Sequence, residues 1–225
     1  RNGEIVLSHE TTLPDDRRIC QSSMSDALAY NLITLSTLLM DEKVFLSGVN
    51  ILLDVKDHDA AENLMRFLSF ACSKASPRQW DSSRIIVGSF HQHMVLQAQA
   101  WQGVLDHLSG LTFAVSYDGA PVNGVRTFDR LGVSWVLLSM EQVTRDFIRD
   151  AHQSGIRVMG WTVNTEVQLQ KMIALGVDGI CTDFPDRAVR NIQEYRYTGD
   201  ASEFVCAAAV ALEGAGGVVY QNIPR

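Results

Sequence analysis

The feature that most constrains the fold is the alternation of short apolar runs, rich in Val and Ile, with longer stretches of helical periodicity. The runs are apolar at nearly every position, which is typical of strands buried on both faces of a parallel sheet. Strands connected in this way by helices form βα units with right-handed crossovers. We expect strands at residues 5–8, 49–55, 84–89, 111–116, 134–138, 157–163 and 179–182.

Helical patterns fill the intervals between these runs. We expect helices at residues 60–73, 93–108, 139–154 and 165–175. Asp59 is a suitable N-cap for the first of them. Ser139 opens a capping-box pattern for the third. The fourth starts at Thr165 and stops at Gly176, a residue type that favours helix ends.

This periodicity alone does not separate a closed barrel from an open, doubly wound sheet. The compact strand–helix–strand units favour a barrel, as do the polar residues at or just past the strand ends, which are Asp54, Lys56, Ser89, Asn164 and Asp183. In a barrel these ends form one face, and catalytic groups lie there. We therefore expect an α/β fold of the (β/α)8 TIM type.

The two ends of the chain suggest that this barrel is incomplete. The chain starts with Arg1, and an Asn2-Gly3 turn leads directly into the strand expected at residues 5–8, as in the middle of a domain. No signal peptide is visible. We expect a fragment or processed chain whose barrel, at residues 1–197, lacks its first strand and leaves an unpaired edge. Residues 198–225 are expected to form a C-terminal helix or a tail.

Composition narrows the class of partner. A chain that is 46% hydrophobic is too apolar to be disordered, and no run is long enough to predict a transmembrane segment. The net charge of −7, without clusters of Lys and Arg, argues against nucleic acid. Peripheral membrane contact stays open. The four Cys are widely spaced, which argues against structural zinc and favours buried thiols in a reducing compartment, the cytoplasm for preference.

Three segments could carry chemistry. His9 follows the expected strand at residues 5–8 and is either a general acid or base or a surface residue in a turn. Asp54 and Lys56 alternate along one strand and so share a face, where they could bind a metal ion and a phosphate oxygen, or form a structural ion pair. Trp161 either walls a substrate pocket or belongs to the core. Asp183 could cap the following helix.

Together these segments resemble the glycerophosphodiester phosphodiesterase family. Residues 161–164 and 176–183 are similar to its "WTVN" and "GVDGIITD" segments almost residue for residue. Residues 2–13 resemble "DG-x-V-V-x-HD-x-TL", residues 50–56 resemble "N-I-E-I-K", and residues 86–90 resemble the strand ending in "SF". The resemblance runs from Gly3 to Arg187.

The resemblance implies a metal-dependent barrel enzyme that hydrolyses glycerophosphodiesters to glycerol 3-phosphate and an alcohol. It assigns His9 and Lys56 to catalysis, Asp54 to a divalent cation (Mg²⁺ or Ca²⁺), and Lys56, Phe90 and Trp161 to substrate binding. The family's "HRG" histidine and "E-x-D" ligands have no counterpart here. We therefore expect the longer parent protein to be active and this chain alone to be inactive.

Other interpretations remain open. Asp54 stands where the family usually has Glu, and the surrounding segment resembles the fungal phosphatidylglycerol phospholipase C branch, which would make the substrate a lipid. A non-catalytic barrel that lost half of its metal site is a second alternative. Another barrel enzyme of phosphorylated metabolites is a weaker one, because the residues after Asn164 do not form a glycine-rich phosphate loop.

Overall fold

The computed structural model describes residues 4–47, 50–57, 60–119, 121–198, 205–208, 211–212, 215–216 and 218–222. Side chains are described as far as Ile192. Among these residues, no helix has the length and apolar character required to cross a membrane.

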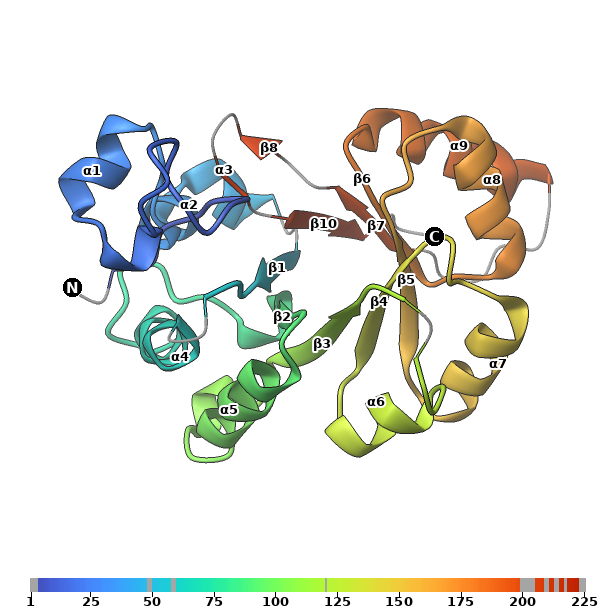
Figure 1. The fold of residues 1–225 in the computed structure, drawn as a ribbon, viewed down its shortest axis with the longest axis horizontal. Helices are drawn as coiled ribbons and strands as arrows, with labels where there is room; N and C mark the ends of the chain where they lie inside the picture. The colour runs from blue at the N-terminus through green and yellow to red at the C-terminus, as the bar shows by residue number, and fades with distance from the viewer. Residues whose placement is uncertain are drawn as a thin grey trace.

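The protein has an α/β fold built around a row of parallel strands that follow one another in chain order (Figure 1). These strands are β1 (Asn50–Asp54), β2 (Ile85–Ser89), β3 (Thr112–Tyr117), β4 (Trp135–Ser139), β5 (Arg157–Trp161) and β6 (Gly179–Thr182). Each pairs in parallel with the next, as right-handed βα units require. The predicted strands from residue 49 onward are confirmed to within a few residues at each end.

The sheet closes into a barrel through two strands from the C-terminal part of the chain. β7 (Val205–Ala208) pairs in parallel with β6. β10 (Val218–Asn222) runs antiparallel to both β7 and β1 and joins them. β8 (Ala211–Leu212) and β9 (Ala215–Gly216) form a separate small sheet. The prediction of an open edge is therefore wrong for the described barrel, because β10 pairs with the backbone groups that this edge would expose. The described part of residues 198–225 is mainly strand rather than a helix or tail.

The predicted strand at residues 5–8 does not enter the sheet. Its backbone instead joins the segment around Thr34: the amide of Leu7 donates to the carbonyl of Ile33, and the amide of Leu35 donates to the carbonyl of Ile5. This leaves only an isolated bridge between Val6 and Thr34. The prediction of a first barrel strand here is wrong, because the backbone of this segment pairs with residues around Thr34 and not with a barrel strand. The Asn2-Gly3 turn lies outside the described residues.

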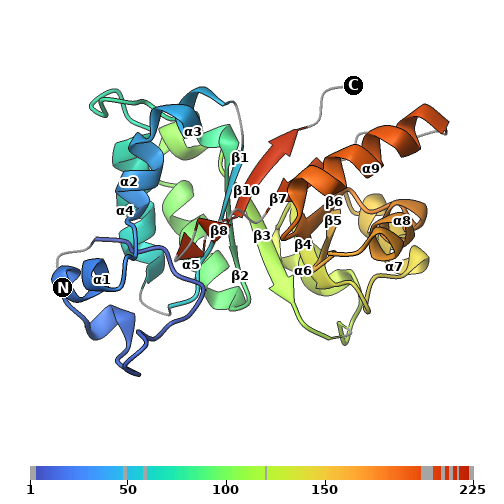
Figure 2. The same ribbon diagram turned by 90° about the horizontal axis from the view of Figure 1, so that it is seen from above.

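Helices cover the outside of the barrel (Figures 1 and 2). Those that follow the parallel strands are α4 (Ala60–Ala71), α5 (Gln92–Gln102), α6 (Arg126–Leu131), α7 (Arg145–Gln153), α8 (Glu166–Leu175) and α9 (Pro185–Thr198). Short 3-10 turns lie at η1 (Ile19–Gln21), η2 (Ser82–Arg84) and η3 (Asp106–Leu108). α1 (Met24–Ala29), α2 (Leu35–Met40) and α3 (Glu42–Leu46) form an N-terminal group on the same side of the barrel as α4 and α5.

Two of the helix starts test the capping predictions. α8 is confirmed: Thr165 and Gln168 form a reciprocal capping box, and Gly176 ends the helix with φ of 87°. The helix predicted from Ser139 begins only at Arg145, where Thr144 caps it. Ser139 is the last residue of β4 and its hydroxyl donates to the carboxylate of Glu141, so the capping pattern at Ser139 serves a turn. The predicted N-cap Asp59 lies outside the described residues.

The core of the barrel has two parts, one on each face of the sheet, and a third cluster of Leu13, Ala27 and Leu32 lies in the N-terminal segment. The larger part fills the space between the strands and the helices. The smaller part fills the interior of the barrel and consists of Leu52, Ile86, Ala114, Trp135, Leu137 and Met159, with Trp161 and Cys181 packed against it. Side chains alternate along a strand. The residues two positions further toward the carboxyl end than these interior residues therefore also point into the barrel.

Candidate active site at the carboxyl ends of the strands

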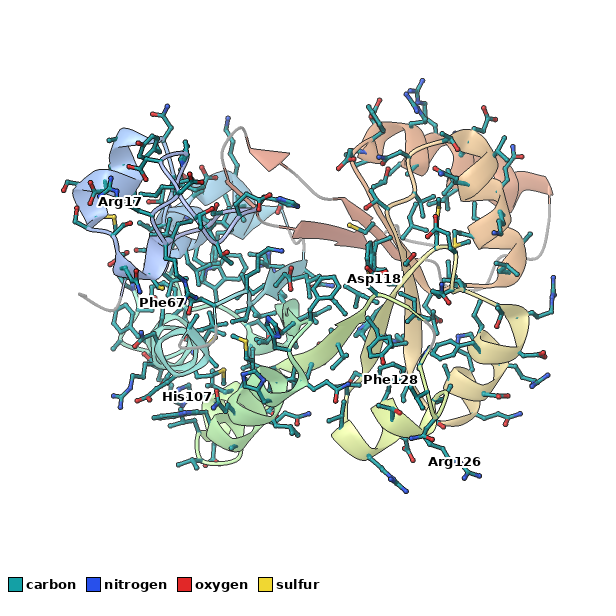
Figure 3. All side chains as sticks on the ribbon, in the orientation of Figure 1. Arg17, Phe67, His107, Asp118, Arg126 and Phe128 are labelled. Carbon is teal, nitrogen blue, oxygen red and sulfur yellow. The ribbon has the colours of Figure 1, made fainter. Side chains whose placement is uncertain are left out.

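We use the term "mouth" for Asp54, Lys56, Phe90, Trp161 and Cys181, which lie at or just after the carboxyl ends of β1, β2, β5 and β6. Leu52 and Met159 belong to the interior cluster, so alternation directs Asp54 and Trp161 inward one layer higher. Figure 3 shows the side chains and labels Asp118, which directly follows β3 at the same end of the sheet. In barrels of this kind, this end carries the binding and catalytic groups.

Asp54 and Lys56 form an ion pair in the mouth. The Nζ of Lys56 lies 2.9 Å from Oδ2 of Asp54, and the two side chains are only 29% and 19% exposed, respectively. This confirms the prediction that they share one face. The second carboxylate oxygen, Oδ1, is buried and has no hydrogen-bond partner among the residues that the structure describes. A buried acceptor without a partner costs free energy unless a ligand, ion or water satisfies it.

The aromatic residues Phe90 and Trp161 meet edge to face, with ring centroids 5.6 Å apart and planes at 78°. Phe90 follows β2 directly and is 43% exposed, whereas the indole Nε1 of Trp161 is buried and finds no hydrogen-bond partner in the described part of the chain. The pair therefore presents an apolar surface to solvent and includes a buried N–H donor that the described residues leave without an acceptor. This places together two residues that the sequence assigned separately to substrate binding.

Cys181 lies next to Trp161 in the mouth, on the neighbouring strand β6. Burial, together with the smaller effect of the charges of Asp183 and Asp54, raises the pKa of its thiol to about 11. The thiol is therefore protonated near neutral pH and is a poor nucleophile. Both carboxylates act on this thiol, so the negative charges at the end of β1 and after β6 lie near one another at the mouth.

His9 contacts its neighbour in sequence, Glu10. Its side chain is 84% exposed, and its Nδ1 is 2.7 Å from Oε1 of Glu10. No contact between His9 and Asp54 or Lys56 is found in the described part of the chain. The placement of residues 5–8 in the sheet is wrong, because that segment pairs with residues around Thr34. That His9 joins Asp54 and Lys56 in one polar mouth stays a prediction.

The loops after β5 and β6 hold a polar pair that the sequence analysis did not connect. The side chain of Asn164 donates from Nδ2 to Oδ2 of Asp183 at 2.6 Å, and its Oδ1 accepts from the amide of Asp183 at 2.9 Å. The sequence suggested only that Asp183 caps a helix. The available signal was that both polar residues follow neighbouring parallel strands, whose carboxyl ends meet at one edge.

One oxygen of the mouth is suited to the expected cation. Oδ1 of Asp54 suits one ligand position, since hard divalent cations prefer carboxylate oxygens. Within the described ranges, however, no group of three or more His, Cys, Asp or Glu side chains is arranged to hold a metal ion. These residues supply one ligand and do not by themselves form a cation site.

The fold is a βα barrel, and the carboxyl ends of its strands carry a charged pair and two packed aromatic rings. In this class of protein, ligands bind at that face. The chain matches the glycerophosphoryl diester phosphodiesterase family over residues 15–187, which is more than half of its length. It belongs to this family.

Individual relatives agree with this assignment. A glycerophosphodiester phosphodiesterase of Bacillus altitudinis is 44% identical over 54 residues, which cover 24% of this chain and 22% of that protein. A second relative, from Bacillus subtilis (strain 168), is 32% identical over 69 residues, or 31% of this chain and 28% of that protein. These alignments thus span about a quarter of the relatives' length.

Solved structures support the fold. A phosphodiesterase of Oleispira antarctica, in complex with the product sn-glycerol-3-phosphate, superposes with a TM-score of 0.67 at 16% identity, covering 85% of this chain and 81% of that one. A glycerophosphodiester phosphodiesterase of Parabacteroides distasonis gives a TM-score of 0.63 at 19% identity, covering 86% and 79%. At these identities the likeness shows the barrel fold alone.

Proposed function

We propose that the protein is a metal-dependent phosphoric diester hydrolase that cleaves glycerophosphodiesters to glycerol 3-phosphate and an alcohol. Membership of the family supports the reaction class. The observation that carries the proposal is the half-buried Lys56–Asp54 pair in the mouth, beside the exposed face of Phe90. A cation and an apolar wall together suit a ligand with a phosphoryl group and a short carbon backbone.

Lys56 supplies the positive charge in this proposal. Its ammonium group neutralises negative charge that develops on the phosphoryl oxygens, and the surrounding protein excludes enough water to strengthen that interaction. Asp54 holds Lys56 in place through Oδ2, 2.9 Å from Nζ. Its other oxygen is a candidate ligand for a divalent cation completed by groups beyond the described residues; such a cation would supply further positive charge at the phosphate.

Phe90 and Trp161 form the substrate wall. Their edge-to-face packing fixes both rings, and the glycerol carbons would lie against the exposed part of Phe90. The Nε1–H of Trp161 would donate a hydrogen bond to a substrate oxygen if the mouth opens by a side-chain adjustment.

His9 is proposed as the proton-transfer group. Glu10 binds Nδ1 of its imidazole, which leaves Nε2 to exchange a proton. The residue would move one proton at the attacking or the leaving oxygen. For location, we propose the cytoplasm; the free thiols of Cys20, Cys72 and Cys181 support a reducing compartment.

The finer choice of substrate is between a small diester and a lipid. The exposed ring of Phe90 is compatible with both, and the lipid alternative corresponds to phospholipase C-type cleavage of phosphatidylglycerol. Peripheral membrane contact would accompany the second alternative.

The test is an assay of the full-length natural protein with glycerophosphocholine and with phosphatidylglycerol vesicles, each with Mg²⁺, Ca²⁺ or EDTA. Metal-dependent release of glycerol 3-phosphate from glycerophosphocholine supports the proposal. Turnover of phosphatidylglycerol alone favours the lipid alternative. The absence of turnover of both substrates, in a protein that melts cooperatively, would overturn the enzymatic proposal and favour a non-catalytic barrel.

A further inference from the structure

We propose that Asn164 is a positioning residue. Its side chain joins the loop after β5 to the loop after β6, next to Trp161 and Cys181, and so fixes the shape of the mouth. This goes beyond the residues proposed to act on substrate, because Asn164 contacts the loops and not the mouth itself. Its kinetic consequences rest on the proposed function, whereas its structural consequences do not.

The evidence is the number of bonds that one side chain makes. The Nδ2 of Asn164 donates to Oδ2 of Asp183 at 2.6 Å. Its Oδ1 accepts from the amide of Asp183 at 2.9 Å and from the hydroxyl of Thr182 at 3.2 Å. Each of these partners belongs to β6 or the loop that follows it, whereas Asn164 belongs to the loop after β5. One amide group therefore joins both loops.

The backbone of Asn164 is also held. Its amide donates to Oε1 of Gln168 at 3.0 Å, inside the capping box of α8. Its carbonyl accepts from Nη1 of Arg187 at 2.9 Å, on α9. The guanidinium of Arg187 lies 4.4 Å from the ring centroid of Phe184. The loop after β5 is thus tied to the starts of both α8 and α9, which lie side by side (Figure 2).

These ties reach the mouth through a short stretch of backbone. The amide of Val163 donates to the carbonyl of Cys181 at 2.8 Å. The amide of Met140 donates to the carbonyl of Trp161 at 2.8 Å. Trp161 and Cys181 are therefore held by bonds that flank the Asn164 contacts, and a shift of the loop after β5 would move both side chains.

A merely local role predicts something different. If Asn164 only ended β5, its replacement would disturb its own neighbours in sequence and leave the mouth unchanged. We call the side-chain bonds of Asn164 to Thr182 and Asp183 the clamp. The clamp predicts instead that the amides of Val163 and Met140 lose protection from hydrogen exchange, although neither bonds to the Asn164 side chain. These two amides are independent reporters, because their own acceptors remain in every variant.

The experiment compares N164A, N164D and the exchanged pair N164D/D183N with the wild-type chain. N164A removes the three side-chain bonds, and N164D sets two carboxylates against each other at 2.6 Å. The exchanged pair restores one carboxylate and one amide, with Asn at 183 donating to Asp at 164. H152A is the matched control, since it breaks a 2.8 Å contact with Asp178 that lies among the amino ends of β5 and β6.

The expected result is a roughly tenfold loss of protection at Val163 and Met140 in N164A and N164D, with recovery in the exchanged pair. Acrylamide quenching of Trp161, read as the difference from W161F, increases in the same two variants and recovers in the pair. H152A leaves both readouts unchanged. In the kinetic assay, N164A lowers kcat/KM by about 10- to 100-fold, mainly through KM, because the wall and not the charged pair has moved.

Unchanged protection and quenching in a folded N164A would overturn the inference, and so would equal losses in H152A. If N164A fails to fold, N164D and its exchanged pair still decide the matter, since failure of the pair to recover exchange protection also contradicts the clamp. The exchange and quenching results hold whether or not the protein turns over a phosphodiester, so failure of the proposed function would be recognised separately.

Discussion

Replacing Lys56 with Met tests the centre of the proposed site. Methionine keeps most of the apolar stem and removes the ammonium group, which lies 2.9 Å from Oδ2 of Asp54. At that separation and an effective dielectric constant of about 20, the gross attraction between the two charges is about 6 kcal/mol. The cost of removing both charged groups from water cancels most of this attraction. For a charged hydrogen bond that is partly exposed, we expect a loss of about 1.5 kcal/mol in the free energy of unfolding, or about 3 to 6 °C in Tm.

The effect on activity is expected to be larger than the effect on stability. Removing one group that stabilises transition-state charge typically lowers kcat by about 10²- to 10³-fold. We expect this loss for K56M, measured as metal-dependent release of glycerol 3-phosphate by the full-length protein. K56R keeps the charge with a different geometry and is expected to recover part of it.

The same measurement on D54N and on D54N/K56M separates two roles of Lys56. If Lys56 acts only as the partner of Asp54, the second substitution changes nothing once Asp54 is gone. If Lys56 acts on the phosphate, kcat falls further in the double variant. Retention of kcat within about threefold in a folded K56M would refute the assignment of Lys56 to transition-state stabilisation.

Three further predictions concern stability and reactivity. T165A removes the capping box of α8 and should lower Tm by about 2 to 4 °C, corresponding to about 1 kcal/mol, while T165S should not; equal melting of both variants would contradict the cap. G160A places a Cβ 2.9 Å from Sδ of Met172 and should cost about 1 to 3 kcal/mol by chemical denaturation. The same change should cost less when G160A/M172A is compared with M172A; an equal cost would locate the strain elsewhere. The pKa of the Cys181 thiol is raised to about 11, mainly by burial, so the thiol stays protonated as the pH rises past the pKa of an ordinary thiol. The rate of its alkylation by iodoacetamide should therefore keep increasing about tenfold per pH unit up to about pH 11. A plateau of the rate near about pH 9 would show an ordinary thiol.

The positions of the parallel strands could be read from the sequence because each is a local pattern. An apolar run such as residues 85–89 has no polar face to expose, so it is stable only when buried on both sides. The joint placement of Asp54 and Lys56 is equally local, since alternate residues share a face. The start of α8 at Thr165 was also predictable, because a capping box needs only four consecutive residues.

Other parts of the site depended on partners far away in the sequence. The edge-to-face contact of Phe90 with Trp161 joins β2 to β5, and nothing near either residue indicates the other. The bonds of Asn164 to Asp183 likewise span two loops and required the register of β5 against β6. Such contacts follow from the order of the strands and from the closure of the sheet, which brings the ends of separate strands together around one mouth.

The sequence by itself determined the class of fold, the strand positions from residue 49 onward and the face shared by Asp54 and Lys56. Only the tertiary structure decided which partner the segment of residues 5–8 takes and how the barrel closes. Residues 5–8 have the apolar pattern of a strand, yet their backbone pairs beside Thr34, and β10 occupies the place between β7 and β1. The physical reason is that a local pattern states which residues need burial and hydrogen bonds, whereas the competition between distant segments decides which partner provides them.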